Sequence, residues 1–201
     1  MNNKSALIRY YKVFLFILFF TSDLHSQALT KNINFEHISI DQGLSHSTVF
    51  SIIQDHKGFI WFGTLDGLNK YDGYSFKFYK SNPFDKKTLS NNIVFKVFED
   101  QDNNLWIGTL GGGLNKFDRK EEKFIQFRYS AKDPNSISND NVRSIYQDSK
   151  KRIWIGTDNG LNLFNSKTNS FSRYYSEKNN KNSLSNNNIW SLYEMSSMPD
   201  V

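Results

Sequence analysis

The sequence predicts an all-β fold of β-propeller blades, each a four-stranded antiparallel sheet, and three observations lead to this prediction. A Trp-x-Gly-Thr motif occurs three times, within 60–64, 105–109 and 153–157. The copies recur every 45 to 48 residues, a spacing typical of stacked supersecondary units. Between glycines, aspartates and asparagines lie short runs rich in Val, Ile, Phe, Tyr and Trp, as strands and hairpins require.

The expected strands occupy the same places in each copy. In the first two copies they are 49–54, 59–64, 68–71, 76–79, 94–99, 105–109, 114–117 and 124–129. No window shows a helical hydrophobic period of useful length. We expect three complete blades and part of a fourth within 35–195: blade 1 at about 44–80, blade 2 at about 89–129, blade 3 at about 137–175 and partial blade 4 at about 184–195, with a non-repeat tail at 196–201. Such a set forms an open arc, because propellers close with about four or more blades.

Apolar residues on both faces of the first strand favour a propeller over a sandwich. Val49 and Ile53 lie on one face, and Phe50 and Ile52 on the other. A strand with two apolar faces has to be covered on both sides. Sheets stacked around an axis provide that cover. A sandwich, the alternative fold, predicts no regular period near 45 residues.

Length differences between the repeats are confined to two joints. Relative to the first copy, the second has one extra residue within 109–114 and two within 117–124, and the third keeps only the latter two. Insertions of this kind predict surface turns at the joints and packed elements between them. The repeated tryptophans and in-strand glycines are interpreted as structural: Trp61, Trp106, Trp154, Gly63, Gly108 and Gly156.

The first hairpin of each repeat carries a residue expected to have positive φ. In the first copy it is Gly58, and in the second Asn103, which tolerates that conformation. The third copy has Lys151 at this place. We therefore expect mild strain or a different turn there.

Residues 1–26 have the three parts of a secretory signal peptide. Lys4, Arg9 and Lys12 form the positive flank, 13–20 is an uninterrupted apolar run, and cleavage is expected before Gln27. The run is shorter than the roughly 20 residues that span a bilayer. We expect a periplasmic or secreted protein without a membrane span in the mature chain. The alternative is an uncleaved N-terminal anchor.

Composition disfavours several functional classes. The chain has no Cys, so disulfides, thiolate zinc sites and a lipoprotein anchor are excluded. Its formal charge falls from +5 to +3 once the three cations and one aspartate of the signal segment are removed. The remaining Lys and Arg are scattered rather than massed, which argues against nucleic acid as a partner.

Residues typical of catalysis or metal binding do not form a recognisable set. His37, His46 and His56 lack the short spacing of metal ligands. Asp100 and Asp102 imitate the start of a calcium loop, but the glycine and glutamate that such a loop needs are missing, so they are interpreted as turn residues. We expect no catalytic residues, no metal, no cofactor and no enzyme activity.

The run Q-D-x-x-G-x-I-W-x-G-T-x-x-G-L-N-x-x-D, from Gln54 to Asp72, resembles the two-component regulator propeller repeat. That repeat builds the periplasmic sensor region of hybrid two-component system histidine kinases, many of which respond to carbohydrates. The resemblance covers about 35–195, and it implies that 35–39 is the outermost strand of a blade. It also implies a truncated chain that stops one strand into blade 4 and has no kinase of its own.

A ligand site is expected on the loops that lead into the first strand of each blade and on those between the second and third strands. The candidate residues are His46, Asp66, Asn91, Asn92, Asn139, Asp140, Asp158 and Asn159. Amides and carboxylates suit a hydroxyl-rich ligand, because they offer donors and acceptors. The alternative is that Asn and Asp are simply turn formers here.

The function expected from these features is extracytoplasmic ligand sensing or interaction within a two-component receptor. The expected partners are an oligosaccharide ligand and either the remaining propeller repeats or another copy of the chain. Two other classes stay open, because fold does not determine function. One is a secreted propeller enzyme of the lyase type, and the other is a protein-binding scaffold.

Overall fold

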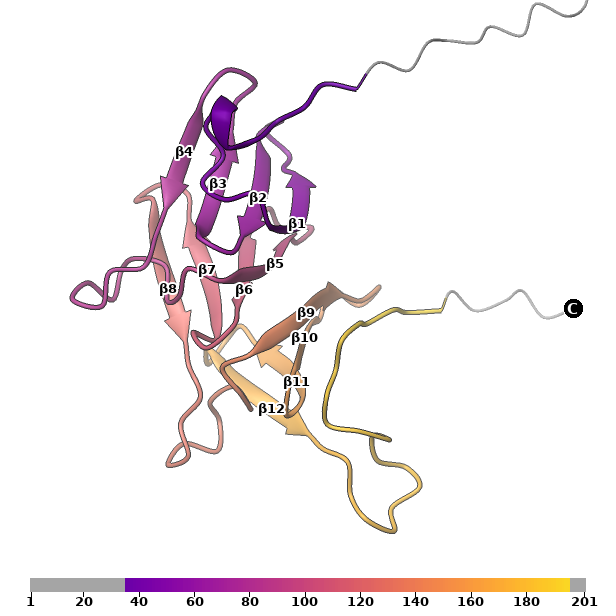
Figure 1. The fold of residues 1–201 in the computed structure, drawn as a ribbon. Coiled ribbons are helices and arrows are strands. Elements are labelled where there is room, and N and C mark those ends of the chain that lie inside the picture. The colour runs from indigo at the N-terminus through magenta and orange to yellow at the C-terminus, as the bar shows by residue number, and fades with distance from the viewer. Residues whose placement is uncertain (1–34, 196–201) are drawn as a thin grey trace, which may run out of the picture. The chain divides into compact units, whose positions relative to one another are not determined.

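The computed structural model describes residues 35–195, and this part of the chain contains three four-stranded antiparallel sheets (Figure 1). The all-β propeller-blade prediction is confirmed. The one helical element described is the 3-10 turn η1, Ile40–Gln42. The predicted signal peptide, 1–26, and the predicted tail, 196–201, lie outside the described residues.

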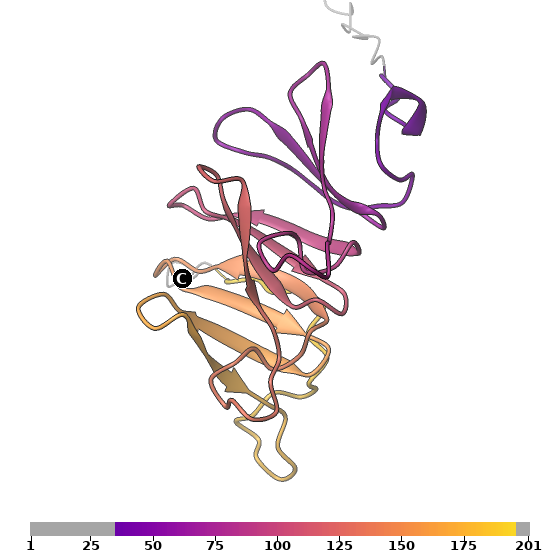
Figure 2. The same ribbon diagram turned by 90° about the vertical axis from the view of Figure 1, so that its left-hand side faces the viewer.

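Each sheet is a meander in which consecutive strands pair (Figure 2). The first sheet consists of β1 Val49–Gln54, β2 Ile60–Thr64, β3 Gly67–Tyr71 and β4 Phe76–Tyr79. The second consists of β5 Val94–Glu99, β6 Leu105–Thr109, β7 Leu114–Asp118 and β8 Lys123–Phe127. The third consists of β9 Val142–Gln147, β10 Ile153–Thr157, β11 Gly160–Asn165 and β12 Ser170–Tyr174. Both joints of variable length are turns, one before β7 and the other before β8.

The core lies between neighbouring sheets, where a tryptophan of one sheet meets aromatic residues of the next. Trp61 on β2 is fully buried, and its ring lies 5.4 Å from that of Phe117 on β7. Trp106 on β6 is buried in the same way, 5.0 Å from Phe164 on β11. Trp154 on β10 is only half-buried. The stacking of one sheet on the next therefore accounts for the burial of the first two.

The in-strand glycines lie where the first strand of the following repeat approaches most closely. A Cβ added to Gly63 would come 2.8 Å from Val94 Cγ1, and one added to Gly108 would come 2.5 Å from Val142 Cγ1. At Gly156 the Cβ would lie 2.7 Å from the carbonyl oxygen of Ile189. A side chain larger than hydrogen would hold the sheets apart.

Two expected end strands do not form. Residues 35–39 are not a strand, and Ser39 instead begins η1 with a capping box that includes Gln42. Residues 184–195 are not a strand either, although Ile189 N–H donates to the Thr157 carbonyl oxygen at 2.9 Å. A first strand needs the second strand of its own sheet as a partner, and the described chain offers none beyond this segment.

The second apolar face of β1 is also less covered than expected. Phe50 is 40% exposed and Ile52 is 60% exposed, whereas Ser51 between them is buried. Phe50 meets Phe95 of the second blade, with the rings 5.3 Å apart, but within the described residues no sheet is stacked over Ile52. The two-sided cover inferred for the first strand of the repeat is therefore wrong for β1.

The first hairpin keeps the same backbone in all three repeats. Gly58, Asn103 and Lys151 have φ of 87°, 63° and 61°. The turn is therefore retained rather than changed at Lys151, which adopts a left-handed conformation that costs an L-residue about 1–2 kcal/mol.

Candidate functional site

A buried polar cluster anchors each loop that leads into a first strand. In the second repeat, Asn115 is fully buried and its Oδ1 accepts from Ser90 N–H at 3.0 Å. Its Nδ2 donates to Ser90 Oγ at 2.8 Å, and that hydroxyl lies 3.3 Å from Thr109 Oγ1. The same cluster recurs as Ser45, Thr64 and Asn69 and as Ser138, Thr157 and Asn162. The loops at this end are consequently held on a rigid base.

Three predicted ligand residues close turns within their own loops. The acceptor and donor pairs are His46 Nδ1 with Thr48 N–H at 2.9 Å, Asn91 Oδ1 with Ile93 N–H at 2.9 Å and Asn139 Oδ1 with Asn141 N–H at 2.8 Å. A side chain that accepts from the backbone two residues later builds an Asx-type turn. These contacts support the turn-former interpretation for the three positions.

Two further predicted residues hold the connection between one blade and the next. Asn92 Oδ1 accepts from Ser81 N–H at 2.7 Å, and Asp140 Oδ1 accepts from Tyr129 N–H at 2.7 Å. Ser81 and Tyr129 follow the last strands of blades 1 and 2. Asn92 and Asp140 thereby fasten the chain where it passes from one sheet to the next.

The loops that lead into the first strands and those between the second and third strands form one end of the blades, here named the loop end. The carboxylates at the loop end are paired with cations. Asp66 lies 2.6 Å from Lys80 Nζ, and Asp140 lies 3.3 Å from Arg128 Nη2. Asp158 is paired as well, because its two oxygens accept from Arg143 Nε at 2.6 Å and Nη2 at 3.0 Å. The hydrogen bond from Arg143 lowers the pKa of Asp158, although burial opposes the shift. The loop end therefore carries balanced charge.

The predicted residues come together only in part. Asp66 lies near Asn92, with Asn92 Nδ2 donating to Asp66 Oδ1 at 3.4 Å. Asn159 is exposed, and its backbone N–H donates to Thr157 Oγ1 at 3.2 Å. The eight positions thus form a band of turns and clamps along the repeats rather than one pocket.

Sequence reasoning missed the role of the aspartate that lies six residues before each tryptophan. The Oδ2 atoms of Asp55, Asp100 and Asp148 accept from the indole Nε1 of Trp61, Trp106 and Trp154 at 2.8, 2.8 and 2.9 Å. The Oδ1 atom of each closes the hairpin turn. The constant spacing of Asp and Trp was the available signal.

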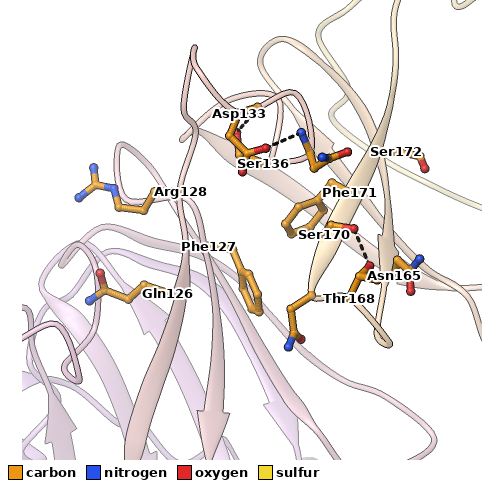
Figure 3. A pocket seen from close by; sticks show the side chains of 12 residues that line it. Gln126, Phe127, Arg128, Asp133, Ser136, Asn165, Thr168, Ser170, Phe171 and Ser172 are labelled. Carbon is orange, nitrogen blue, oxygen red and sulfur yellow. Dashed lines mark hydrogen bonds between the residues drawn. The ribbon is translucent and has the colours of Figure 1, made fainter.

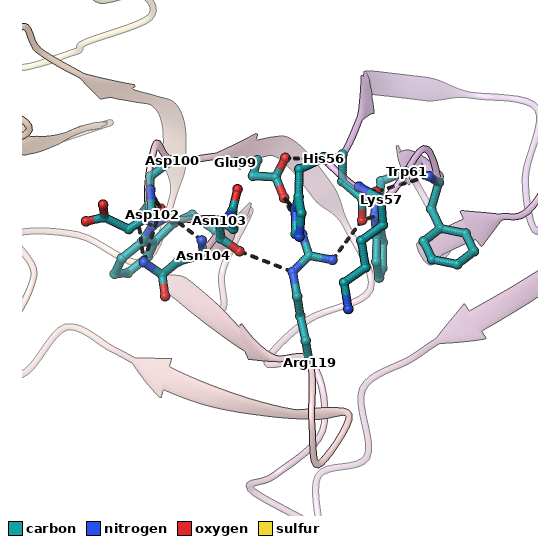
Figure 4. A network of polar contacts seen from close by, with 12 residues as sticks. His56, Lys57, Trp61, Glu99, Asp100, Asp102, Asn103, Asn104 and Arg119 are labelled. Atoms are coloured by element: carbon teal, nitrogen blue, oxygen red, sulfur yellow. Dashed lines mark hydrogen bonds and ion pairs between the residues drawn. The ribbon is translucent and has the colours of Figure 1, made fainter.

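A cluster of charges links the first two blades at the end formed by the hairpins between first and second strands (Figure 4). The guanidinium of Arg119 donates to Asp55 Oδ2 at 2.7 Å and to Glu99 Oε1 at 2.5 Å. His56 N–H donates to Glu99 Oε2 at 2.8 Å. Burial raises the pKa of Asp55, but hydrogen bonds from Trp61 and Arg119 outweigh it and lower the pKa. All these groups bind one another, so the cluster serves to join blades.

The buried Asp148 predicts a loss of stability in acid. Burial raises its pKa, but hydrogen bonds from Trp154 and Arg152 outweigh this effect and lower the pKa from 3.8 to about 2. A carboxylate with a depressed pKa stabilises the fold above its unfolded pKa, and this contribution disappears as the pH falls from 3.8 to about 2. Melting midpoints of wild type and Asp148→Asn should therefore converge over this interval. A constant difference between them would contradict this assignment.

A polar hollow lies between the last strands of the second and third blades (Figure 3). Its lining includes Phe127 and Phe171 together with Arg128, Asp133 and Ser136. Both phenylalanines belong to the core between the sheets, with rings 5.7 Å apart. The hollow is thus a product of blade packing and brings no group of chemical interest toward another.

Residues 35–195 contain neither a cluster of metal-ligating side chains nor a membrane-spanning helix. In this range no group of three or more His, Asp or Glu residues is placed to hold a metal ion. The same range contains no helix of the length and apolarity needed to cross a bilayer.

The repeated contacts coincide with a known sequence family. The family described as "Two component regulator propeller" matches residues 43–66, 88–111 and 136–159. The chain carries three two-component regulator propeller repeats. Each matched segment of this repeat begins before the serine of a polar cluster and ends in the turn after the Trp-x-Gly-Thr strand.

Part of the chain is similar to a histidine kinase. The chain is 43% identical over 77 residues to histidine kinase P4 of Formosa agariphila, a match that covers 38% of this chain and 6% of the kinase.

Two solved extracellular domains from B. thetaiotaomicron are similar in structure. One, from a protein described as the hybrid two-component system BT3049, matches with a TM-score of 0.70 and 30% identity, over 78% of this chain and 22% of that one. The other, from BT4673, matches with a TM-score of 0.60 and 27% identity, over 74% of this chain and 19% of that one. The chain thus spans about a fifth of the length of these extracellular domains.

Proposed function

We propose that the chain is an extracytoplasmic ligand-sensing segment of a two-component signalling receptor and that its ligand is a carbohydrate. The observation that carries this proposal is the likeness of its three regulator propeller repeats to the extracellular domain of a hybrid two-component system, with a TM-score of 0.70. The kinase activity would belong to a module other than these repeats. The regulator propeller family is a sensor region rather than an enzyme type, so ligand binding is the activity that fits it.

The loop end of the blades supports a binding role. Its loops rest on buried Ser, Thr and Asn clusters, so binding groups there are positioned in advance. Its carboxylates are neutralised by Lys80, Arg128 and Arg143, which favours an uncharged ligand. Saccharides match this chemistry through hydroxyl groups that both donate and accept hydrogen bonds.

A thermal-shift screen tests this proposal. The full chain would be heated with a panel of neutral oligosaccharides, with nucleotides and amino acids as comparison classes. A bound saccharide should stabilise the fold by about 2.7 kcal/mol at a concentration of about 100 Kd. Stabilisation by the comparison classes alone would contradict a carbohydrate sensor, and an unchanged midpoint with all classes would contradict ligand sensing.

Chemical-shift mapping then locates the sensing end. We expect a stabilising saccharide to perturb the amide signals of Asn91, Asn139 and Asp158 on the loop end. The equivalent control set is the hairpin aspartates Asp55, Asp100 and Asp148, which should stay unchanged because they point into the opposite end of each blade. Equal perturbation of both sets would argue against a dedicated sensing end.

A further inference from the structure

The first strand of every complete blade contains a β-bulge at the same place. In β1, Val49 pairs with Thr64 and Ser51 with Gly63, so Phe50 has no partner in the ladder. In β5 the pairing skips Phe95, and in β9 it skips Arg143. A bulge turns the extra side chain away from the regular face of the sheet. The three bulges therefore present Phe50, Phe95 and Arg143 in equivalent directions.

A fourth side chain joins them from the segment after the third blade. Ile189 packs on Gly156 as Val94 packs on Gly63 and Val142 on Gly108. Trp190, the next residue, consequently occupies the position of the bulged residues. This equivalence holds although the segment is not a strand.

The four residues form one cluster, here named the bulge cluster: Phe50, Phe95, Arg143 and Trp190. The rings of Phe50 and Phe95 are 5.3 Å apart, and those of Phe95 and Trp190 are 6.3 Å apart. The Arg143 guanidinium carbon lies 5.1 Å from the centre of the Phe95 ring and 4.5 Å from that of Trp190. First strands β1, β5 and β9 are spatial neighbours, so separate blades contribute to a single surface.

The bulge cluster stays open to solvent. Phe50 is 40% exposed and Trp190 is 57% exposed, while Phe95 and Arg143 are half-buried. Single exposed aromatic residues are ordinary on a protein surface, but several in contact with one another mark a binding surface. Aromatic rings and an arginine are also the side chains that contribute most to binding.

We propose that the bulge cluster is the platform on which this segment holds a neutral saccharide, an inference that rests on the proposed sensing function. The apolar C–H face of a sugar ring would stack on the exposed rings of Phe50, Phe95 and Trp190. Its hydroxyl groups would meet the guanidinium of Arg143, whose bonds to Asp158 use Nε and Nη2 and leave further N–H donors. Stacking and hydrogen bonding together give the combination of apolar and polar contacts that ligand sites use.

The charges around the cluster select against an acidic sugar. Arg143, the cation of the cluster, is already paired by the two oxygens of Asp158, and its own pKa is raised by that hydrogen bond. A uronate would have to compete with Asp158 for this guanidinium. A neutral sugar ring does not compete with Asp158 for Arg143, because stacking on the aromatic rings requires no charge.

Calorimetric titration of the full chain tests the assignment. The probes are the neutral hexasaccharides of glucose, xylose and mannose, with hexagalacturonate as the charged counterpart. We expect at least one neutral probe to bind and Phe95→Ala or Phe50→Ala to weaken it by about tenfold or more, the equivalent of about 1.4 kcal/mol. Quenching of the exposed Trp190 by the same probe should saturate with the same Kd.

A matched control is Phe78→Ala on β4, which removes an aromatic ring that is 46% exposed but lies on the last strand. It should leave binding unchanged. Phe95 is half-buried, so Phe50→Ala and Trp190→Ala, at the more exposed positions, separate loss of binding from loss of folding.

The outcomes distinguish this inference from the function on which it rests. Neutral saccharides that bind equally well to all three cluster variants would overturn the platform and leave carbohydrate sensing standing. Preferred binding of hexagalacturonate would overturn the neutral-ligand assignment. If no hexasaccharide binds while other sugars stabilise the chain in the thermal-shift screen, the proposed role of the bulge cluster is overturned and the sensing function stands. Failure of that screen would remove the proposed function as well.

Discussion

Replacement of Trp106 by Ala should lower the free energy of unfolding by about 3–5 kcal/mol, because a large buried aromatic leaves a cavity that two stacked sheets cannot close. Trp106 is 2% exposed and lies 5.0 Å from Phe164 of the next blade. The change would also leave Asp100 without the indole N–H that it accepts at 2.8 Å. Urea denaturation of the wild type and the variant measures the difference.

Trp154→Ala provides the matched control for that prediction. Trp154 lies in the same Trp-Ile-Gly-Thr run and makes the same bond to its aspartate, at 2.9 Å, but it is half-buried. Within residues 35–195 its one aromatic ring contact is with Tyr174 of its own blade. We expect a clearly smaller loss of stability than for Trp106→Ala. Equal losses would mean that the tryptophan acts within its own sheet and not between blades.

Replacement of Asn115 by Ala is expected to cost about 2–3 kcal/mol, the upper part of the range for a buried donor left without an acceptor. The carboxamide of Asn115 is the acceptor for Ser90 N–H and a donor to Ser90 Oγ. No water can replace it easily, since Asn115 is fully buried. The loop before β5 should loosen, which faster amide exchange at Ser90 would report.

Asn182→Ala is the corresponding surface control. Asn182 is exposed in the loop after β12, so its replacement should stay within about 0.5 kcal/mol of the wild type. If Asn115→Ala were as mild as this control, the repeated Ser, Thr and Asn clusters would have no role in holding the loops.

Most of the strands could be predicted from sequence because a strand pattern in one repeat recurs at the same place in the others. The bounds predicted for β1, β4, β5 and β6 are those observed, and other predicted bounds in the first two blades differ by a few residues at most. An alternating or apolar run that recurs at a fixed period leaves little choice of element or register. Strand formation failed where a repeat lacks its neighbours, at 35–39 and 184–195, because pairing depends on partners that a local pattern does not reveal.

The candidate site could be predicted less well, for a physical reason. Asn and Asp serve both turns and ligands with the same atoms, so Asn91 and Asn139 could not be assigned before their backbone partners were known. The bulge cluster was harder still, because Phe50 and Phe95 look like ordinary strand residues. Only the register of β1 and β5 shows that they leave the ladder.

The contact between each in-strand glycine and the next repeat constrains how such a gene can change length. Gly63 meets Val94, and Gly108 meets Val142, through the same close approach. A recombination that removed the whole second repeat would bring Gly63 against Val142 and restore an equivalent contact at the new junction. A deletion of half a repeat would place an unrelated side chain there. Tandem duplication and loss of entire units are therefore the length changes that this interface tolerates.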